Sequence, residues 1–121
     1  MNYVDPNKQR ATALEIAFAN KALRQLCENK AKAICDLGQI TAAKLRSRLA
    51  DIREASSVAD LAAGNPRELD SNGFHLTLDL RSGRQLVISA NHNVNPTLGS
   101  GHIDWQKVAR VKIERITESH D

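Results

Sequence analysis

Imidazole and basic side chains are the groups of this chain that could carry out chemistry on a substrate. The sequence contains four histidines, His75, His92, His102 and His120. An imidazole can take up or release a proton near neutral pH, and arginine or lysine can hold a phosphate group. The net charge of +3 is compatible with a polyanionic partner such as RNA.

A structural metal is not expected from the cysteines and histidines. The histidines are scattered, and no Cys/His spacing of the zinc-finger kind occurs. Cys27 and Cys35 lie on one predicted helix, about 12 Å apart along its axis, which is too far for a disulfide. We therefore expect two packing thiols, no metal and no other cofactor.

Length and composition predict a single domain. The chain has 121 residues, of which 41% are hydrophobic and only 3% aromatic, so the core is expected to be aliphatic. Residues 1–10 are polar and predict a flexible N-terminal arm, and residues 11–121 predict the folded domain. No segment is apolar over the roughly 20 residues of a membrane span, and no signal peptide is evident, so we expect a cytoplasmic protein with no membrane partner.

The first half of the domain is predicted to be mainly helical. Alternating apolar residues predict a strand over residues 13–18. Asn20 is expected to cap one helix that continues to Gly38, and Thr41 to cap a second helix with an apolar stripe of Leu45, Leu49 and Ile52. Residues 57–61 predict a single helical turn.

The second half is predicted to be a sheet. Apolar and polar residues alternate over residues 74–80, and residues 85–90 are rich in types that favour β-strands. Ser82-Gly83 lies between the two segments, so they are predicted to form a hairpin. A polar loop over residues 91–100 precedes a last strand that starts near Val108. We therefore predict an α+β fold in which two N-terminal helices pack on one face of a small antiparallel sheet. Strand parity places Glu114, Ile116, Glu118 and His120 together on the opposite, open face.

Three stretches between residues 35 and 120 resemble a family of toxins in their order and spacing. They are KLRSRLADIREASSVADLAAGNPREL, NGFHLTLDLRSGRQLVI and IDWQKVARVKIERITESHD. The first is similar to the second helix of the family, the second to its hairpin, and the third to its last strand and terminal histidine. On these stretches the chain resembles the RelE/ParE superfamily of toxin–antitoxin modules, and within it the HigB-like killer protein branch.

The resemblance implies a RelE-like fold and a ribosome-dependent mRNA endonuclease. Its expected partners are the ribosome, mRNA and a cognate antitoxin with a helix-turn-helix domain, which keeps the toxin inactive. His120 stands at the terminal histidine of the family, which implies an acid or base, and Arg67 and Arg84 lie near positions of phosphate contact. Further cations that could bind RNA or the ribosome, or simply lie in a solvated surface, are Arg81, Lys112 and Arg115.

The chain departs from the family at three positions where catalytic groups are usual. Asp70 stands in place of a lysine, Gln85 in place of an arginine and Ser119 in place of a tyrosine. Two other functions therefore stay open. One is a ParE-like toxin that inhibits DNA gyrase without cutting RNA, and the other is a degenerate toxin kept for antitoxin binding.

Overall fold

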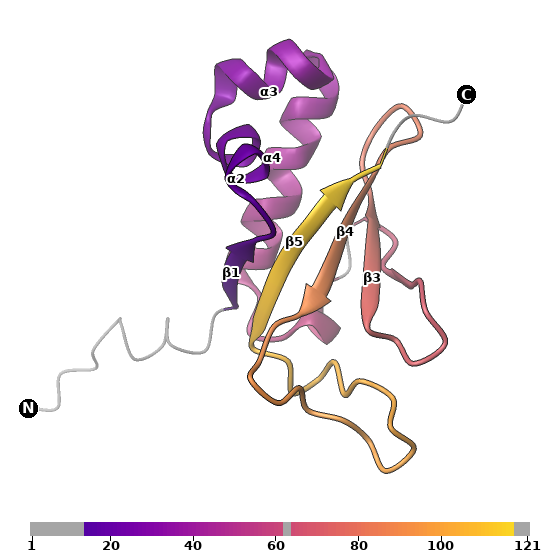
Figure 1. Ribbon diagram of the computed structural model, residues 1–121. Coiled ribbons are helices and arrows are strands. Elements are labelled where there is room, and N and C mark those ends of the chain that lie inside the picture. Colours follow the sequence, from indigo (N-terminus) through magenta and orange to yellow (C-terminus); the bar gives the residue numbers. More distant parts are fainter. Residues whose placement is uncertain (1–13, 62–63, 118–121) are drawn as a thin grey trace, which may run out of the picture.

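The computed structural model describes residues 14–61 and 64–117 (Figure 1). The predicted N-terminal arm and His120 lie outside these residues. The described part is an α+β fold with three α-helices, a short 3-10 helix and five strands. Their order is β1 (Glu15–Phe18), α2 (Lys21–Glu28), α3 (Lys30–Leu37), α4 (Gln39–Glu54), η1 (Val58–Asp60), β2 (Arg67–Glu68), β3 (His75–Asp79), β4 (Gln85–Ala90) and β5 (Arg110–Ile116).

The prediction of one helix from Asn20 to Gly38 is wrong, because Asn29 divides it in two. Asn20 caps α2 as expected, its side-chain oxygen accepting the Leu23 N–H at 2.8 Å. Asn29 is extended, with φ −110° and ψ 108°, and its side-chain oxygen accepts the Lys32 N–H at 3.1 Å. An asparagine side chain competes with the backbone for hydrogen bonds in this way, so it ends α2 and caps α3.

The cap predicted for the next helix, and the role of one cysteine, are also corrected. α4 begins at Gln39, so Thr41 lies inside its first turn, buried, and Gly38 is the residue before the helix. Cys27 is buried, and burial raises the pKa of its thiol to about 11. Cys35 is exposed and therefore does not serve as a packing thiol.

The sheet is mixed, not antiparallel as predicted. Its strand order is β1-β5-β4-β3-β2, and β1 pairs with β5 in parallel while all other pairs are antiparallel. The helical layer and the rest of the domain separate β1 from β5 in the sequence, so no hairpin joins them and their relative direction is not set by a turn. β2, with only two residues, is too short to produce a periodic pattern and was not predicted.

The predicted hairpin is confirmed. β3 and β4 pair from His75 with Ser89 to Asp79 with Gln85. Ser82 and Gly83 have φ values of 62° and 77°, the positive pair that a type I′ turn requires. The turn closes with hydrogen bonds between the Leu80 N–H and the Arg84 carbonyl at 2.9 Å and between the Arg84 N–H and the Arg81 carbonyl at 3.2 Å.

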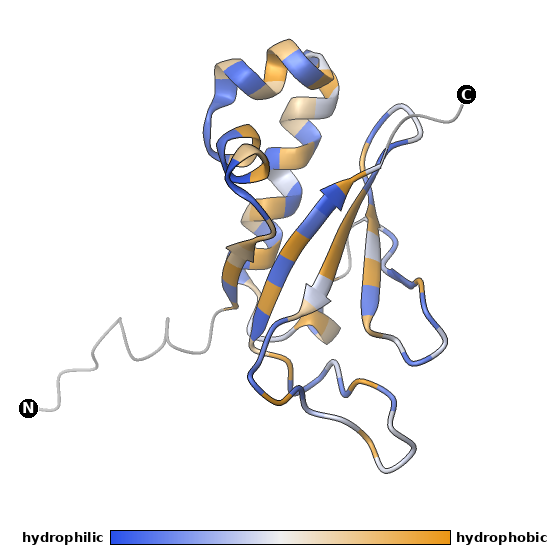
Figure 2. Ribbon diagram, in the orientation of Figure 1, coloured by the Kyte–Doolittle hydropathy of each residue, from blue (hydrophilic) through white to orange (hydrophobic). Residues whose placement is uncertain are grey.

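The hydrophobic core lies between the helices and one face of the sheet. The predicted stripe of Leu45, Leu49 and Ile52 on α4 is fully buried. It packs in one cluster with aliphatic side chains of the three central strands, including Leu78, Leu86, Ile88, Val111 and Ile113. Figure 2 shows the corresponding alternation of hydrophobic and hydrophilic residues along β5. All three helices lie on this side, so the opposite face of the sheet is left without a helix (Figure 1).

A β-bulge changes the predicted parity of the last strand. Ile88 pairs with Ile113, but the next residue of β4, Val87, pairs with Arg115, so Glu114 is an extra residue in β5. After the bulge the two faces exchange, and Ile116 packs against the core. The prediction that Glu114 and Ile116 share the open face is therefore wrong. Glu118 and His120, the other residues of that prediction, lie outside the described part.

Candidate functional site: the open face of the sheet

The open face, defined as the side of the sheet opposite the helices, is built from two adjacent rows of cross-strand partners. One row runs from Arg67 through Thr77 and Val87 to Arg115, and the other from His75 through Ser89 to Lys112. The middle members, Thr77, Val87 and Ser89, are 4%, 0% and 0% exposed. They form a floor of small side chains, with Arg67 and Arg115 on either side of it in the first row and His75 and Lys112 in the second. Beyond Lys112 the second row ends at Ala17 of β1.

The cations around this floor differ in how far they are neutralised. Arg67 donates to the Asp79 carboxylate at 2.9 Å, and this hydrogen bond lowers the pKa of Asp79. Lys112 has its Nζ 3.8 Å from Glu114 Oε2. Arg115 is exposed, and its side chain makes no hydrogen bond or ion pair within residues 14–61 and 64–117. Arg115 is thus the guanidinium most available to an anionic ligand.

The polar groups of the floor are satisfied. Ser89 Oγ donates to Glu114 Oε2 at 2.6 Å, and Thr77 Oγ1 donates to the Arg67 carbonyl at 3.4 Å. The bulge brings the Glu114 side chain to this face, where it reaches both Ser89 and Lys112. These contacts fix the side chains on which a ligand over the floor would rest.

A histidine and an aspartate form a pair at one corner of the open face. His75, the first residue of β3, has its Nδ1 2.9 Å from Asp70 Oδ1. The same oxygen accepts the backbone N–H of His75 at 2.8 Å. The His75 side chain is 25% exposed. Asp70 therefore orients an imidazole.

A second histidine–carboxylate pair lies at the β2 edge and links two segments of the chain. His102 Nε2 is 2.9 Å from Glu68 Oε1, and its Nδ1 is 2.9 Å from the Ile103 carbonyl. The hydrogen bond to Glu68, followed by the one to Ile103, raises the pKa of His102. Nearby, the Trp105 indole donates to the Gly73 carbonyl at 2.7 Å. These contacts tie the long loop after β4 to the turn before β3.

Three of the residues predicted for the site, Arg67, Lys112 and Arg115, meet on the open face. Arg84 lies in the hairpin turn with its Nη1 3.5 Å from the Thr117 carbonyl. Arg81 is at the hairpin tip and lines a groove of about 380 Å³ against α4 on the helical side, so it is separate from the other three. Sequence reasoning missed His75 as a site residue. The signal was the spacing of Asp70 and His75 across a tight turn.

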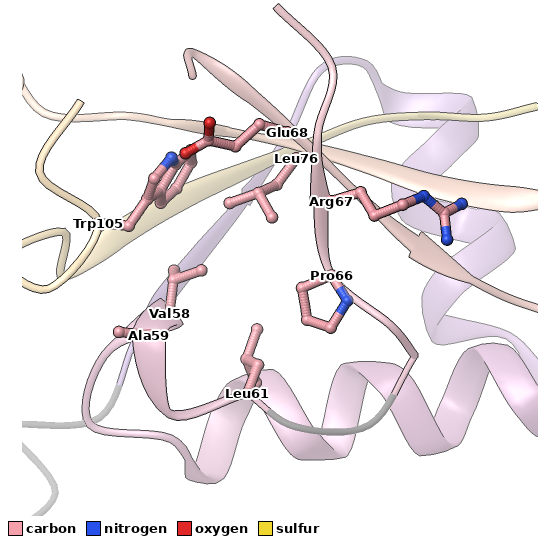
Figure 3. A pocket seen from close by; sticks show the side chains of 8 residues that line it. All are labelled: Val58, Ala59, Leu61, Pro66, Arg67, Glu68, Leu76 and Trp105. Carbon is pink, nitrogen blue, oxygen red and sulfur yellow. The ribbon is translucent and has the colours of Figure 1, made fainter. Parts of the chain in front are cut away.

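A cavity of about 570 Å³ lies beside the β2 edge (Figure 3). Its lining is mainly apolar, with Val58, Leu61, Pro66 and Trp105 among its residues. Figure 3 shows the Arg67 guanidinium pointing away from it. Glu68, its acidic member, is held by His102. The carboxylate that lines the cavity is thus already engaged by an imidazole, and the open face is the better candidate.

The described residues contain neither a grouped set of metal ligands nor a membrane-spanning helix. In residues 14–61 and 64–117, no three histidine, cysteine, aspartate or glutamate side chains are grouped to hold a metal ion. In the same ranges no helix has both the length and the apolar character needed to cross a membrane. The chain matches no model of a known protein family, and searches of curated proteins and of solved structures also give no match.

Proposed function

We propose that this protein is the toxin of a type II toxin–antitoxin module and cleaves mRNA on the ribosome. The observation that carries the proposal is the open face, where Arg67, Lys112 and Arg115 surround a floor of small side chains. A sheet face without covering helices gives an extended RNA strand direct access to these cations. The resemblance to HigB-like toxins supports the same activity, and the RelE-like fold is part of the proposal.

The side chains of the open face suit a reaction in which the enzyme mainly positions the RNA and stabilises charge. Basic side chains can hold the scissile phosphate and stabilise the charge that develops on it. The three cations share the face with three carboxylates, Asp79, Glu114 and Asp70, so the formal net charge of the face is close to zero. Such a face binds free RNA weakly, because affinity for nucleic acid grows with the number of phosphates neutralised. The ribosome would then supply the missing orientation of the mRNA, in the cytoplasm where translation occurs.

The cognate antitoxin is the other proposed partner. A groove of about 730 Å³ between β1 and α2 is lined by Ile16 and Phe18, both half-buried, and by polar residues of α2. β1 is an edge strand, and such an edge with apolar side chains is a surface that a partner protein can cover. We propose that the antitoxin, with a helix-turn-helix domain, keeps the toxin inactive by binding it.

The test is cleavage of a reporter mRNA by the purified chain in a translation reaction. We expect cuts within the translated reading frame, and none when translation is blocked or when the RNA is naked. Reversing the charge of both β5 cations, Lys112→Glu with Arg115→Glu, is expected to reduce cleavage by about 100-fold or more, the usual size of lost electrostatic stabilisation. Growth arrest on expression should disappear in parallel.

The matched control reverses two exposed cations of the helical layer, Lys30→Glu with Arg46→Glu, and should leave cleavage unchanged. Its change in net charge is identical to that of the β5 variant. Intact mRNA at saturating protein would overturn the nuclease proposal. If that result came with inhibition of DNA supercoiling by gyrase, the ParE-like function would take its place.

A further inference from the structure

The Asp70–His75 pair has the arrangement of a proton-transfer group. We infer that His75 is the general base of the RNA cleavage reaction and that Asp70 is its positioning residue. This inference rests on the proposed function and names the side chain that performs its chemistry. It assigns the base to a residue on β3 and not to the terminal histidine, His120.

The hydrogen bonds around His75 fix which ring nitrogen can act. A carboxylate only accepts hydrogen bonds, so the contact of Asp70 Oδ1 with Nδ1 requires the proton to be on Nδ1. The neutral ring then has its lone pair on Nε2, for which residues 14–61 and 64–117 provide no hydrogen-bond partner. A carboxylate that fixes one nitrogen and leaves the other available is the arrangement by which catalytic histidines are oriented.

Asp70 is itself held in position. Its backbone carbonyl accepts the Gly73 N–H at 3.0 Å, which closes the turn between β2 and β3. Its side-chain oxygen also accepts the His75 backbone N–H at 2.8 Å, so the carboxylate is anchored to the strand that carries the imidazole. The Phe74 ring contacts His75 edge-on, with centroids 4.7 Å apart. The imidazole therefore has few rotamers available to it, as preorganised catalysis requires.

The place of His75 in the sheet puts it within reach of a phosphate bound by β5. His75, Ser89 and Lys112 are successive members of one cross-strand row. Two strand spacings separate His75 from Lys112, roughly 10 Å between their backbones. A lysine side chain spans much of that distance, so one nucleotide over Ser89 could place its phosphate at Lys112 and its ribose at His75. Arg67 and Arg115, in the adjacent row, flank the same space.

The reaction then needs only RNA and water. His75 Nε2 takes the proton of the ribose 2′-hydroxyl, and the 2′-oxygen attacks the adjacent phosphorus to form a new P–O2′ bond. The P–O5′ bond breaks, and its electron pair stays on the 5′-oxygen, which takes a proton from a water molecule. The products are a 2′,3′-cyclic phosphate and a 5′-hydroxyl end. The imidazolium returns its proton to the solvent, so no metal or redox step is needed.

The experiment compares His75→Gln with His102→Gln in the translation-dependent cleavage assay. Glutamine in place of His75 can still donate to Asp70, so the turn is kept while the base is lost. We expect kcat to fall by about 100-fold or more with little change in KM. His102→Gln removes the imidazole of the other histidine–carboxylate pair and should leave cleavage unchanged.

Chemical rescue separates a catalytic from a structural role. In His75→Ala, added imidazole should restore at least about 10-fold of the lost rate, because a free base can occupy the space of the deleted ring. It should not rescue the Lys112→Glu/Arg115→Glu variant. Asp70→Asn should lower kcat less than loss of His75, since it disturbs orientation alone, and Asp70→Glu should recover part of the rate.

The outcomes distinguish this inference from the proposed function. Undiminished cleavage by folded His75→Gln, or cleavage that His120→Ala alone abolishes, would overturn His75 as the base and leave the nuclease proposal intact. If the unaltered protein does not cut ribosome-bound mRNA, both proposals fail together. Product ends other than a 2′,3′-cyclic phosphate or the 3′-phosphate formed from it would also contradict the mechanism.

Discussion

Two histidine–carboxylate pairs flank the same turn between β2 and β3, and they differ in how many ring nitrogens are engaged. Both have an N···O distance of 2.9 Å. In the Glu68–His102 pair the second nitrogen contacts the Ile103 carbonyl, so both nitrogens face acceptors. In the Asp70–His75 pair Nε2 has no such contact in the described part of the chain.

The second nitrogen separates a structural histidine from an available one. Only the doubly protonated ring of His102 can donate to both acceptors, so these contacts raise its pKa, and the ring joins two segments. In His75 only Nδ1 contacts an acceptor among the described residues, so Nε2 can keep its lone pair. His92 gives a third case, because its Nε2 accepts the Ala109 N–H at 3.0 Å and must be unprotonated to do so. A short distance to a carboxylate therefore does not by itself identify a role.

The largest effect expected from breaking the structural pair comes from Gly73→Ala. Gly73 has φ +73°, and a Cβ there would lie 2.5 Å from His102 Cε1 and 3.1 Å from Glu68 Oε2. The left-handed backbone is also costly for alanine. We expect a loss of about 1–3 kcal/mol in the free energy of unfolding, measured by urea denaturation.

Gly101→Ala is the matched control for this substitution. Gly101 lies beside His102 and has φ +90°, a similar left-handed backbone, but a Cβ there would meet no atom within 4 Å. Its effect should be limited to the backbone cost, about 1 kcal/mol, and should be smaller than that of Gly73→Ala. Equal effects of the two substitutions would show that the contact between Gly73 and His102 does not hold the loop.

A smaller, pH-dependent effect is expected for His102→Gln. The pKa of His102 is raised by Glu68 and by the Ile103 carbonyl, so the folded protein binds this proton more tightly than the unfolded chain does. Its stabilising contribution is complete below the ordinary histidine value of about 6.5 and is lost as the pH rises through the folded pKa. The stability difference between the unaltered protein and His102→Gln should therefore be larger near pH 5.5 than near pH 8.5.

Unfolding curves of both proteins at the two pH values make this measurement. A difference that grows toward alkaline pH would contradict the raised pKa of His102. An NMR titration of the His102 ring would give the same answer directly.

The smallest effect is expected for the hydrated ion pair between Arg67 and Asp79 on the open face. The side chains of Arg67 and Asp79 are 45% and 42% exposed, so water screens their attraction. Asp79→Asn should cost less than about 1 kcal/mol at neutral pH. Arg67 lowers the pKa of Asp79, so the contribution is present above the ordinary aspartate value and is lost as the pH falls through the folded pKa. A loss of several kcal/mol at neutral pH would show that this pair is not the weak surface contact described.

Local patterns predicted the elements that depend on local chemistry. Leu45, Leu49 and Ile52 mark the buried side of α4, and Ser82-Gly83 marks the hairpin. Asn29 was not recognised as a break, since the apolar spacing continues across it. The parallel pairing of β1 with β5 depends on contacts between distant segments, about which strand periodicity carries no information.

The sequence predicts only part of the candidate site, because the register between paired strands determines which side chains lie next to one another. The sequence predicts a binding role for Arg67, Lys112 and Arg115 from their positive charge. Their position on one face of the sheet depends on the pairing of four strands, which the sequence does not show. Arg81, chosen on the same grounds, lies against α4. His75 was read as a polar member of an alternating strand, and only the turn geometry shows that Asp70 orients it.

The extra residue in β5 adds one side chain to the open face without changing the direction of its neighbours. Because Glu114 has no partner on β4, removing it would place Arg115, which pairs with Val87, directly after Ile113, which pairs with Ile88. The alternation would then be regular, and Arg115 would stay on the open face. Replacing Glu114 would leave those directions unchanged. In a diverged homologue, the number of residues between the positions of Val111 and Ile116 would therefore show whether the bulge, and with it the extra side chain beside Ser89, is kept, even where the residues themselves have changed.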